Sequence, residues 1–153
     1  MAHGKYATAL DRVLELVVLL NQDMTASLAR DGLTGSRATV LWTLRQRGPS
    51  TQRALADALK VSARTITGLV DGLADGGLVT REPHPTDRRA FLVTFTERGT
   101  ALVETLERDH AELAHLLFAR MPAATFAGFA AGLDEILDRL RAAGLRHDLA
   151  AGS

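Results

Sequence analysis

Apolar residues recur at the spacing of an α-helix in six separate stretches of this chain. In the first, residues 6–28, they stand alternately four and three residues apart, a heptad-like seam that favours packing against another helix. Two long stretches near the other end, residues 97–120 and 122–144, carry apolar stripes of the same kind. The pattern therefore predicts long helices at both ends of one mainly α-helical chain.

The middle of the chain contains three shorter predicted helices, each with a capping residue at its start. Thr34 or Ser36 can cap the first, and Ser50 or Thr51 can cap the second. The third begins at Ser62 after a short turn, so the second and third helices together form a helix-turn-helix pattern. The buried face of the third helix is predicted from apolar residues on one stripe: Ile66, Leu69, Val70 and Leu73.

An antiparallel ribbon of two strands is predicted directly after the third helix. Two glycines, at positions 76 and 77, end that helix. Residues 78–82 then form the first strand, and residues 89–95 form the second. The side chains of the second strand alternate between two faces. One face carries Phe91, Val93 and Phe95, and the other carries Ala90, Leu92 and Thr94.

The loop between the two strands is stiff and basic. Pro83 and Pro85 restrict its backbone, so the loop can hold Arg88 and Arg89 away from the body of the protein at little ordering cost. A basic loop tip is more often an ordinary solvated turn. Its place directly after a helix-turn-helix also fits a wing that reaches the minor groove of DNA, and both interpretations stay open.

The outward face of the third helix divides by charge. Arg64 and the hydroxyl residues lie in its first half, whereas Asp71 and Asp75 lie in its second half. Only the first half can approach a phosphate backbone without repulsion, which is the docking expected of a helix that reads DNA. Short patterns of this kind also arise in ordinary helical proteins, so this feature alone does not decide the function.

Three glycines, at positions 68, 72 and 76, recur on nearly one side of the same helix. Each of them weakens the helix by about 1 kcal/mol relative to alanine. They permit close approach of the helix backbone to DNA, or they weaken binding by the helix so that binding depends on the wing. The sequence leaves both consequences open.

Composition limits the classes of protein to which the chain can belong. With 153 residues, 46% of them apolar, the chain has the size and the core of one ordinary folded domain. It has no cysteine, which excludes disulfides, thiolate metal sites and thiol-based redox sensing. No apolar run approaches the roughly 20 residues of a membrane span, and the N-terminus does not resemble a cleavable signal, so a cytoplasmic protein is expected.

The formal charge of the chain is zero, but it is unevenly distributed. Residues 34–98 contain ten Lys or Arg against six Asp or Glu, a local balance of +4. The parts before and after this segment carry −1 and −3. Because a nucleic-acid partner responds to a basic patch rather than to the total, a net charge of zero does not exclude such a partner.

Catalysis and metal binding have little support in the sequence. The five histidines, at positions 3, 84, 110, 115 and 147, do not form a recognisable nucleophile motif, and no glycine-rich phosphate loop is present. His110, Glu112 and His115 suggest a metal-responsive regulator, but two histidines five residues apart miss the spacing that puts ligands on one helix face. A winged-helix module that binds protein instead of DNA is a further alternative.

Short motifs at compatible spacings run from residue 33 to residue 99. They are Leu33-Thr34, Leu55-Ala56, Val61-Ser62, Thr65-Ile66-Thr67, Val70-Asp71 with Leu73, Gly77-Leu78-Val79 with Arg81, Asp87-Arg88-Arg89, and Thr96 with Gly99. As a set, they resemble the MarR family of winged helix-turn-helix repressors. The resemblance implies a mainly α fold with a small two- to three-stranded antiparallel β-wing, a winged lobe over residues 33–99, and dimerisation helices at residues 5–30 and 97–146.

The resemblance also implies a homodimer that binds double-stranded DNA at a palindromic operator and regulates transcription as a repressor. The residues then expected at the major groove are Ser62, Arg64, Thr65 and Thr67. The residues expected at the minor groove are Arg88 and Arg89, with Asp87 orienting an arginine. No cofactor, metal or catalytic residue is expected.

Dimerisation is also indicated by the residues themselves. The helices at the two chain ends carry more apolar surface than one domain of this size can cover. For any single one of these residues, however, the pattern fits a place in the protein's own core equally well. The expected interface residues are Leu10, Val13, Val17, Leu113, Leu117, Leu133, Ile136 and Leu140. By resemblance, a small lipophilic or phenolic effector would bind between the first, second and fifth helices, but no residue pattern identifies its site.

Overall fold

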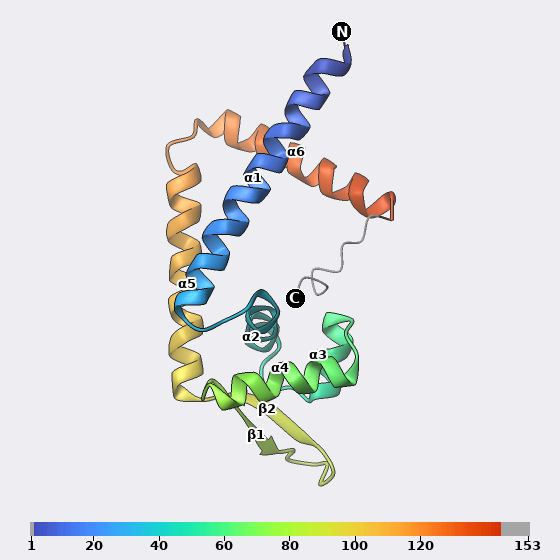
Figure 1. Cartoon of the computed structure of the whole chain (residues 1–153), viewed down its shortest axis with the longest axis vertical. Helices are drawn as coiled ribbons and strands as arrows, with labels where there is room; N and C mark the ends of the chain where they lie inside the picture. Colours follow the sequence, from blue (N-terminus) through green and yellow to red (C-terminus); the bar gives the residue numbers. More distant parts are fainter. Residues whose placement is uncertain (1, 145–153) are drawn as a thin grey trace.

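The computed structural model describes residues 2–144, which form six helices and one two-stranded antiparallel sheet (Figure 1). In chain order the elements are α1 (Ala2–Arg30), α2 (Gly35–Arg47), α3 (Gln52–Leu59), α4 (Ala63–Asp75), β1 (Val79–Pro83), β2 (Phe91–Phe95), α5 (Glu97–Phe118) and α6 (Ala123–Ala142). The predicted mainly α fold with a winged helix-turn-helix is confirmed. Residues 145 and 146 of the expected C-terminal dimerisation helix, and His147, lie outside the described residues.

A lobe built from α2, α3, α4 and the hairpin β1–β2 contains most of the hydrophobic core, and α5 closes one side of it (Figure 1). Its fully buried large side chains are Leu41, Leu44, Leu55, Ile66, Leu73, Val40, Val70, Val93 and Val103. The predicted buried stripe of α4 is confirmed, except that Leu69 is only partly buried where it packs against this core. The core therefore holds α4 by one face and leaves its opposite face open.

Four helices begin at hydroxyl caps, and those of α2, α3 and α4 lie among the capping residues predicted from the sequence. In each, the hydroxyl accepts the backbone N–H three residues later: Thr34, Thr51, Ser62 and Thr96. Between the alternatives, Thr34 rather than Ser36 caps α2, and Thr51 rather than Ser50 caps α3. Ser50 is buried instead, and its hydroxyl donates to the Gly48 carbonyl at 2.8 Å.

The wing has two strands and one further bridge, in agreement with the two to three strands expected. β1 and β2 pair along their whole length, and Ser50 adds an isolated bridge to Val93. β1 begins one residue later than predicted, and β2 begins at Phe91 instead of position 89. The cause of the second shift is a turn in which the Asp87 carboxylate accepts the Arg89 N–H at 3.0 Å, which keeps Arg89 out of the ladder.

Glycine is required where the hairpin meets α5. A Cβ on Gly99 would lie 1.9 Å from the carbonyl oxygen of Leu78, so a larger residue fits only if the backbone moves. Thr96 completes this junction, because its N–H donates to the Leu78 carbonyl at 3.1 Å and its hydroxyl donates to the Gly77 carbonyl at 2.6 Å. α5 therefore anchors the base of the wing.

Helices α1 and α6 extend from the lobe without burying their apolar residues (Figure 1). From residue 4 onwards α1 has no buried side chain, and α6 has none either. Among residues 4–144, fourteen of the fifteen large apolar residues that are exposed lie on α1, α5 or α6. In a single chain α1 and α6 therefore contribute mainly apolar surface, whereas α5 also contributes Val103 and Leu106 to the core.

The two C-terminal helices are separated by a sharp turn. Pro122 lies at the N-cap of α6, with ψ of 140°. Phe118 packs across the turn, with its ring 5.4 Å from that of Phe126 and 5.8 Å from that of Phe129. No single helix among the described residues is long and apolar enough to cross a membrane; α5 and α6 reach that mark only as a pair bent by 118°.

Candidate nucleic-acid interface

Helix α4 and the hairpin lie together at one end of the molecule, away from the N-terminal part of α1 and from α6 (Figure 1). The turn between α3 and α4 depends on Lys60, which has a φ of 55° and is the one non-glycine residue with positive φ in the described part of the chain. Its left-handed backbone ends α3, and Ser62 follows as the cap of α4. The first residues of α4, Ala63 and Arg64, are exposed.

The first turn of α4 presents one cation and one available hydroxyl. Arg64 is exposed, as predicted. The Ser62 hydroxyl accepts the Thr65 N–H at 3.1 Å and donates to the Thr65 hydroxyl at 2.9 Å, so both of its roles are used within the cap. The Thr65 hydroxyl accepts in this pair and donates to no group in the described part of the chain, so its proton is available to an external acceptor.

The wing tip is ordered by side chains that bond to the main chain. His84 Nδ1 accepts the N–H of Thr86 at 3.2 Å and that of Asp87 at 3.0 Å, a role that the sequence did not indicate. Asp87 in turn contacts the main chain of Arg89, and none of the ion pairs among residues 2–144 joins it to a guanidinium. Arg88 and Arg89 are both exposed. The ordered tip thus presents two cations to solvent.

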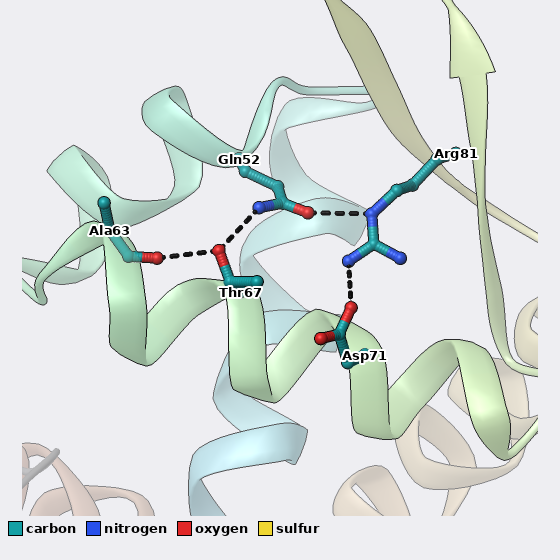
Figure 2. A network of polar contacts seen from close by, with 5 residues as sticks. All are labelled: Gln52, Ala63, Thr67, Asp71 and Arg81. Carbon is teal, nitrogen blue, oxygen red and sulfur yellow. Dashed lines mark hydrogen bonds and ion pairs between the residues drawn. The ribbon is translucent and has the colours of Figure 1, made fainter.

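Four side chains join the wing to the helix-turn-helix, as Figure 2 shows. Arg81 of β1 donates from Nε to Gln52 Oε1 at 2.8 Å and from Nη2 to Asp71 Oδ1 at 2.5 Å. Gln52 donates from Nε2 to the Thr67 hydroxyl at 3.1 Å, and that hydroxyl donates to the Ala63 carbonyl at 2.8 Å. The residues Gln52, Thr67, Asp71 and Arg81 are called the wing network below.

Sequence reasoning missed the wing network. Asp71 is exposed on α4 as expected. It also accepts a hydrogen bond from Arg81 of β1, which lies ten residues further along the chain. In the structure Arg81 is paired with Val93, and residues directly opposite each other point to the same face of a sheet. An arginine at such an inward position requires polar partners, but the sequence does not show which residues supply them.

Gly68 and Gly72 of α4, and Gly76 at its C-cap, differ in the space around them. A Cβ on Gly68 would meet nothing within 4 Å, whereas a Cβ on Gly72 would lie 2.5 Å from Nη2 of Arg37. A Cβ on Gly76 would make ordinary contacts, the nearest at 3.5 Å. Gly72 therefore makes room for a side chain of α2, while Gly68 leaves one exposed patch of α4 bare.

The eight predicted interface residues all lie on α1, α5 and α6. Five of them are between 39% and 57% exposed in the single chain: Leu10, Val17, Leu117, Ile136 and Leu140. The other three are partly buried: Val13, Leu113 and Leu133. Most of the predicted interface is therefore accessible to a second chain.

A cavity of about 670 Å³ opens between the C-terminal end of α1 and helix α5. Its charged lining consists of four carboxylates and one arginine: Asp23, Asp31, Asp109, Glu112 and Arg30. The lining is therefore acidic overall, and it also includes two leucines, Leu113 and Leu116. Over the described residues no three His, Cys, Asp or Glu side chains gather closely enough to hold a metal ion, so His110, Glu112 and His115 do not form such a group.

Comparisons with known proteins point to one family and one fold. The model of the MarR family matches residues 33–91. The HTH-type transcriptional repressor NicR of Pseudomonas putida is 40% identical over 74 residues, which make up 48% of this chain and 47% of that protein. This chain spans about half the length of the curated relatives it matches first. These relatives are named as regulators of transcription and not as enzymes.

Two solved structures show the same fold over most of their length. RV1404 from Mycobacterium tuberculosis is 29% identical, with a TM-score of 0.71 over 84% of this chain and 90% of that chain. YusO from Bacillus subtilis is 17% identical, with a TM-score of 0.79 over 90% of this chain and 98% of that chain. The likeness includes the long terminal helices, because the coverage extends well beyond the central lobe.

Proposed function

This chain belongs to the MarR family by its segment 33–91, and from that premise we propose a function. The protein is a sequence-specific regulator of transcription that binds double-stranded DNA and acts as a repressor. One observation supports this above all others. Exposed arginines occur both in the first turn of α4, at Arg64, and on the wing tip, at Arg88 and Arg89. Helix α4 and the hairpin lie at the same end of the molecule (Figure 1). Such a surface suits two neighbouring grooves of one duplex.

In this proposal the first half of α4 enters the major groove. Arg64 contacts base edges, and the Thr65 hydroxyl donates to a phosphate or a base. Ser62 supports these contacts by holding the first turn, since both roles of its hydroxyl are used within the cap. Thr67 borders the same surface from the second turn.

The wing enters the adjoining minor groove. Arg88 and Arg89 supply its positive charge, and the narrow groove concentrates the negative potential that attracts them. Asp87 supports the tip by accepting the Arg89 N–H, so it orients an arginine through the main chain.

We further propose that the protein is a homodimer built from α1, α5 and α6. Burying one large apolar side chain contributes about 1.5–3 kcal/mol, and these helices expose fourteen such side chains in the single chain. A twofold dimer presents two identical lobes, so its operator is palindromic, with half-sites about one duplex turn apart, roughly 34–36 Å.

DNA binding is tested with fragments selected from the source genome by the purified protein. If binding depends on phosphate contacts, log affinity falls linearly with log salt, by about 0.9 for each contact. Replacing Arg88 and Arg89 by alanine should make the slope shallower by about 3–4 per dimer, since four cations are removed. Arg120→Ala, which removes one cation at the turn between α5 and α6, serves as the control. A flat salt response, or no bound fragment at all, would contradict the proposal and favour a protein partner.

Base contact is tested separately with Arg64→Ala. This change should relax the preference for one base pair by about 1–3 kcal/mol, as measured by competition between operator variants. If Arg64→Ala and the wing double variant both bind like the parent, the assignment of these residues is wrong even if the protein binds DNA.

Dimerisation is tested by sedimentation at micromolar concentration. The parent should sediment as a dimer, and Ile136→Glu should dissociate it, because a buried charge without a partner is costly. Thr125→Glu adds the same charge at an exposed position of the same helix and should leave the dimer intact. A parent that is a stable monomer would refute the dimer.

An effector completes the proposal. Release of the operator by a small lipophilic or phenolic molecule is tested by titrating the complex with simple phenols. The cavity between α1 and α5 has an acidic lining, which favours cations. If small cations release the operator and phenols do not, the phenolic effector is refuted.

A further inference from the structure

Arg81 occupies an inward-facing position of the wing. It is paired with Val93, which is 0% exposed, and residues directly opposite each other in a ladder point to the same face. Only 33% of the Arg81 side chain is exposed. A guanidinium at such a position requires acceptors from the lobe, and it finds them on two different helices, Gln52 on α3 and Asp71 on α4.

The hydrogen bonds of the wing network have one consistent direction. Arginine can only donate, so the side-chain oxygen of Gln52 faces Arg81 and the Gln52 NH₂ group faces Thr67. The Thr67 hydroxyl then accepts from Gln52 and gives its own proton to the Ala63 carbonyl. In the free protein this hydroxyl has no proton left for DNA, so Thr67 is suited to holding the network.

We propose that Arg81 is a positioning residue for DNA recognition, an inference that rests on the proposed function. Its bonds to α3 and α4 fix the direction of the hairpin, and thereby the distance between Arg64 and the arginines of the wing tip (Figure 2). Asp71 offsets the charge of Arg81, so this pair adds no net attraction for phosphate. The pair sets the geometry of recognition, while the exposed arginines supply the contacts.

The first test measures DNA binding of Arg81→Gln and of the charge-balanced double variant Arg81→Gln with Asp71→Asn. If Arg81 positions the wing, the ratio of operator affinity to non-specific affinity falls roughly tenfold, the scale of one mismatched base pair, and the salt slope stays that of the parent. If Arg81 binds a phosphate instead, all duplexes bind more weakly and the slope becomes shallower by about 0.9 for each phosphate that is no longer neutralised. That second result overturns the proposal.

The second test measures the wing without DNA. The chain has no cysteine, so Thr86→Cys on the wing tip and Asp57→Cys on α3, both at exposed positions, provide two sites for spin labels. Diluting the labelled chain with unlabelled chain confines the measured distance to one protomer. We expect a narrow distance distribution in the parent and a broad one in Arg81→Gln. Thr67→Val, which removes the hydroxyl at the other end of the network, should also broaden it.

Arg53→Gln is the matched control for the spin-label experiment, because it removes the same charge from an exposed position of α3. It should leave the distribution narrow. Equal widths in the parent and in Arg81→Gln overturn the proposal, whether or not the protein binds DNA. Broadening in a protein that binds no genomic fragment overturns the proposed function instead, and confirms only that Arg81 holds the wing. Urea midpoints of all variants establish that the lobe is folded in each measurement.

Discussion

Gly68→Ala is expected to stabilise the protein. Gly68 lies in the interior of α4 on its exposed side, and an added Cβ would meet nothing within 4 Å. Alanine favours a helix interior by about 1 kcal/mol over glycine, because glycine loses more backbone entropy on folding. With no steric cost to offset this gain, the free energy of unfolding should rise by about 1 kcal/mol. For a chain of this size, the midpoint of thermal unfolding should rise by about 2–4 °C.

Urea unfolding at one fixed protein concentration measures this gain, since the apparent stability of a dimer depends on concentration. Gly72→Ala is the matched control, with the same change one turn further along α4. There the new Cβ would lie 2.5 Å from Nη2 of Arg37, so the guanidinium must move aside. The control should therefore gain less stability than Gly68→Ala.

The same substitution is expected to weaken operator binding. Gly68 follows Arg64 by about one helical turn on the exposed side of α4, and a methyl group there would keep the helix backbone away from the groove. Greater stability together with weaker binding would identify Gly68 as a glycine required by DNA. If Gly68→Ala unfolds at lower urea than the parent, the helix-propensity reasoning is refuted. If its operator affinity is unchanged, the close approach of α4 is refuted.

Three further predictions concern stability and are measured by urea unfolding. Gly99→Ala places a Cβ 1.9 Å from the Leu78 carbonyl oxygen and should lower the free energy of unfolding by about 3 kcal/mol or more. Ser62→Ala removes the cap of α4 and should cost about 1 kcal/mol. Arg45→Ala breaks an exposed ion pair with Glu107 and should cost less than about 1 kcal/mol, and less still at high salt. A tolerated Gly99→Ala, a neutral Ser62→Ala or a salt-independent Arg45→Ala would contradict the respective reasoning.

The elements of the fold could be predicted because their signals are local. A helix period, a hydroxyl cap and a terminating glycine each act within a few residues, so Ser62 starts α4 where the sequence predicts. The exposure of Arg64, Arg88 and Arg89 follows from the same periodicity and from the stiff loop. The start of β2 was missed because a side chain, Asp87, bonds the main chain of the turn, an interaction that strand periodicity does not report.

The sequence predicted that the terminal helices expose apolar surface, but it did not show which residues of α1 and α6 are exposed. A heptad-like seam is the same whether it packs within one chain or against another. Only the position of the lobe relative to these helices shows that the lobe does not cover them (Figure 1). Phe91 is a similar case. It was predicted to share a strand face with Val93, which is buried, but it is itself 56% exposed.

The sequence by itself therefore determined the order of the helices, the caps that start them, the wing and the arginines that the wing and α4 present. The tertiary structure alone decided which residues meet across elements. Gln52, Asp71 and Arg81 belong to three elements, and a helical or strand period describes each element without its neighbours. Their contact depends on how a hairpin packs against two helices, and packing joins residues whose separation in the sequence carries no pattern.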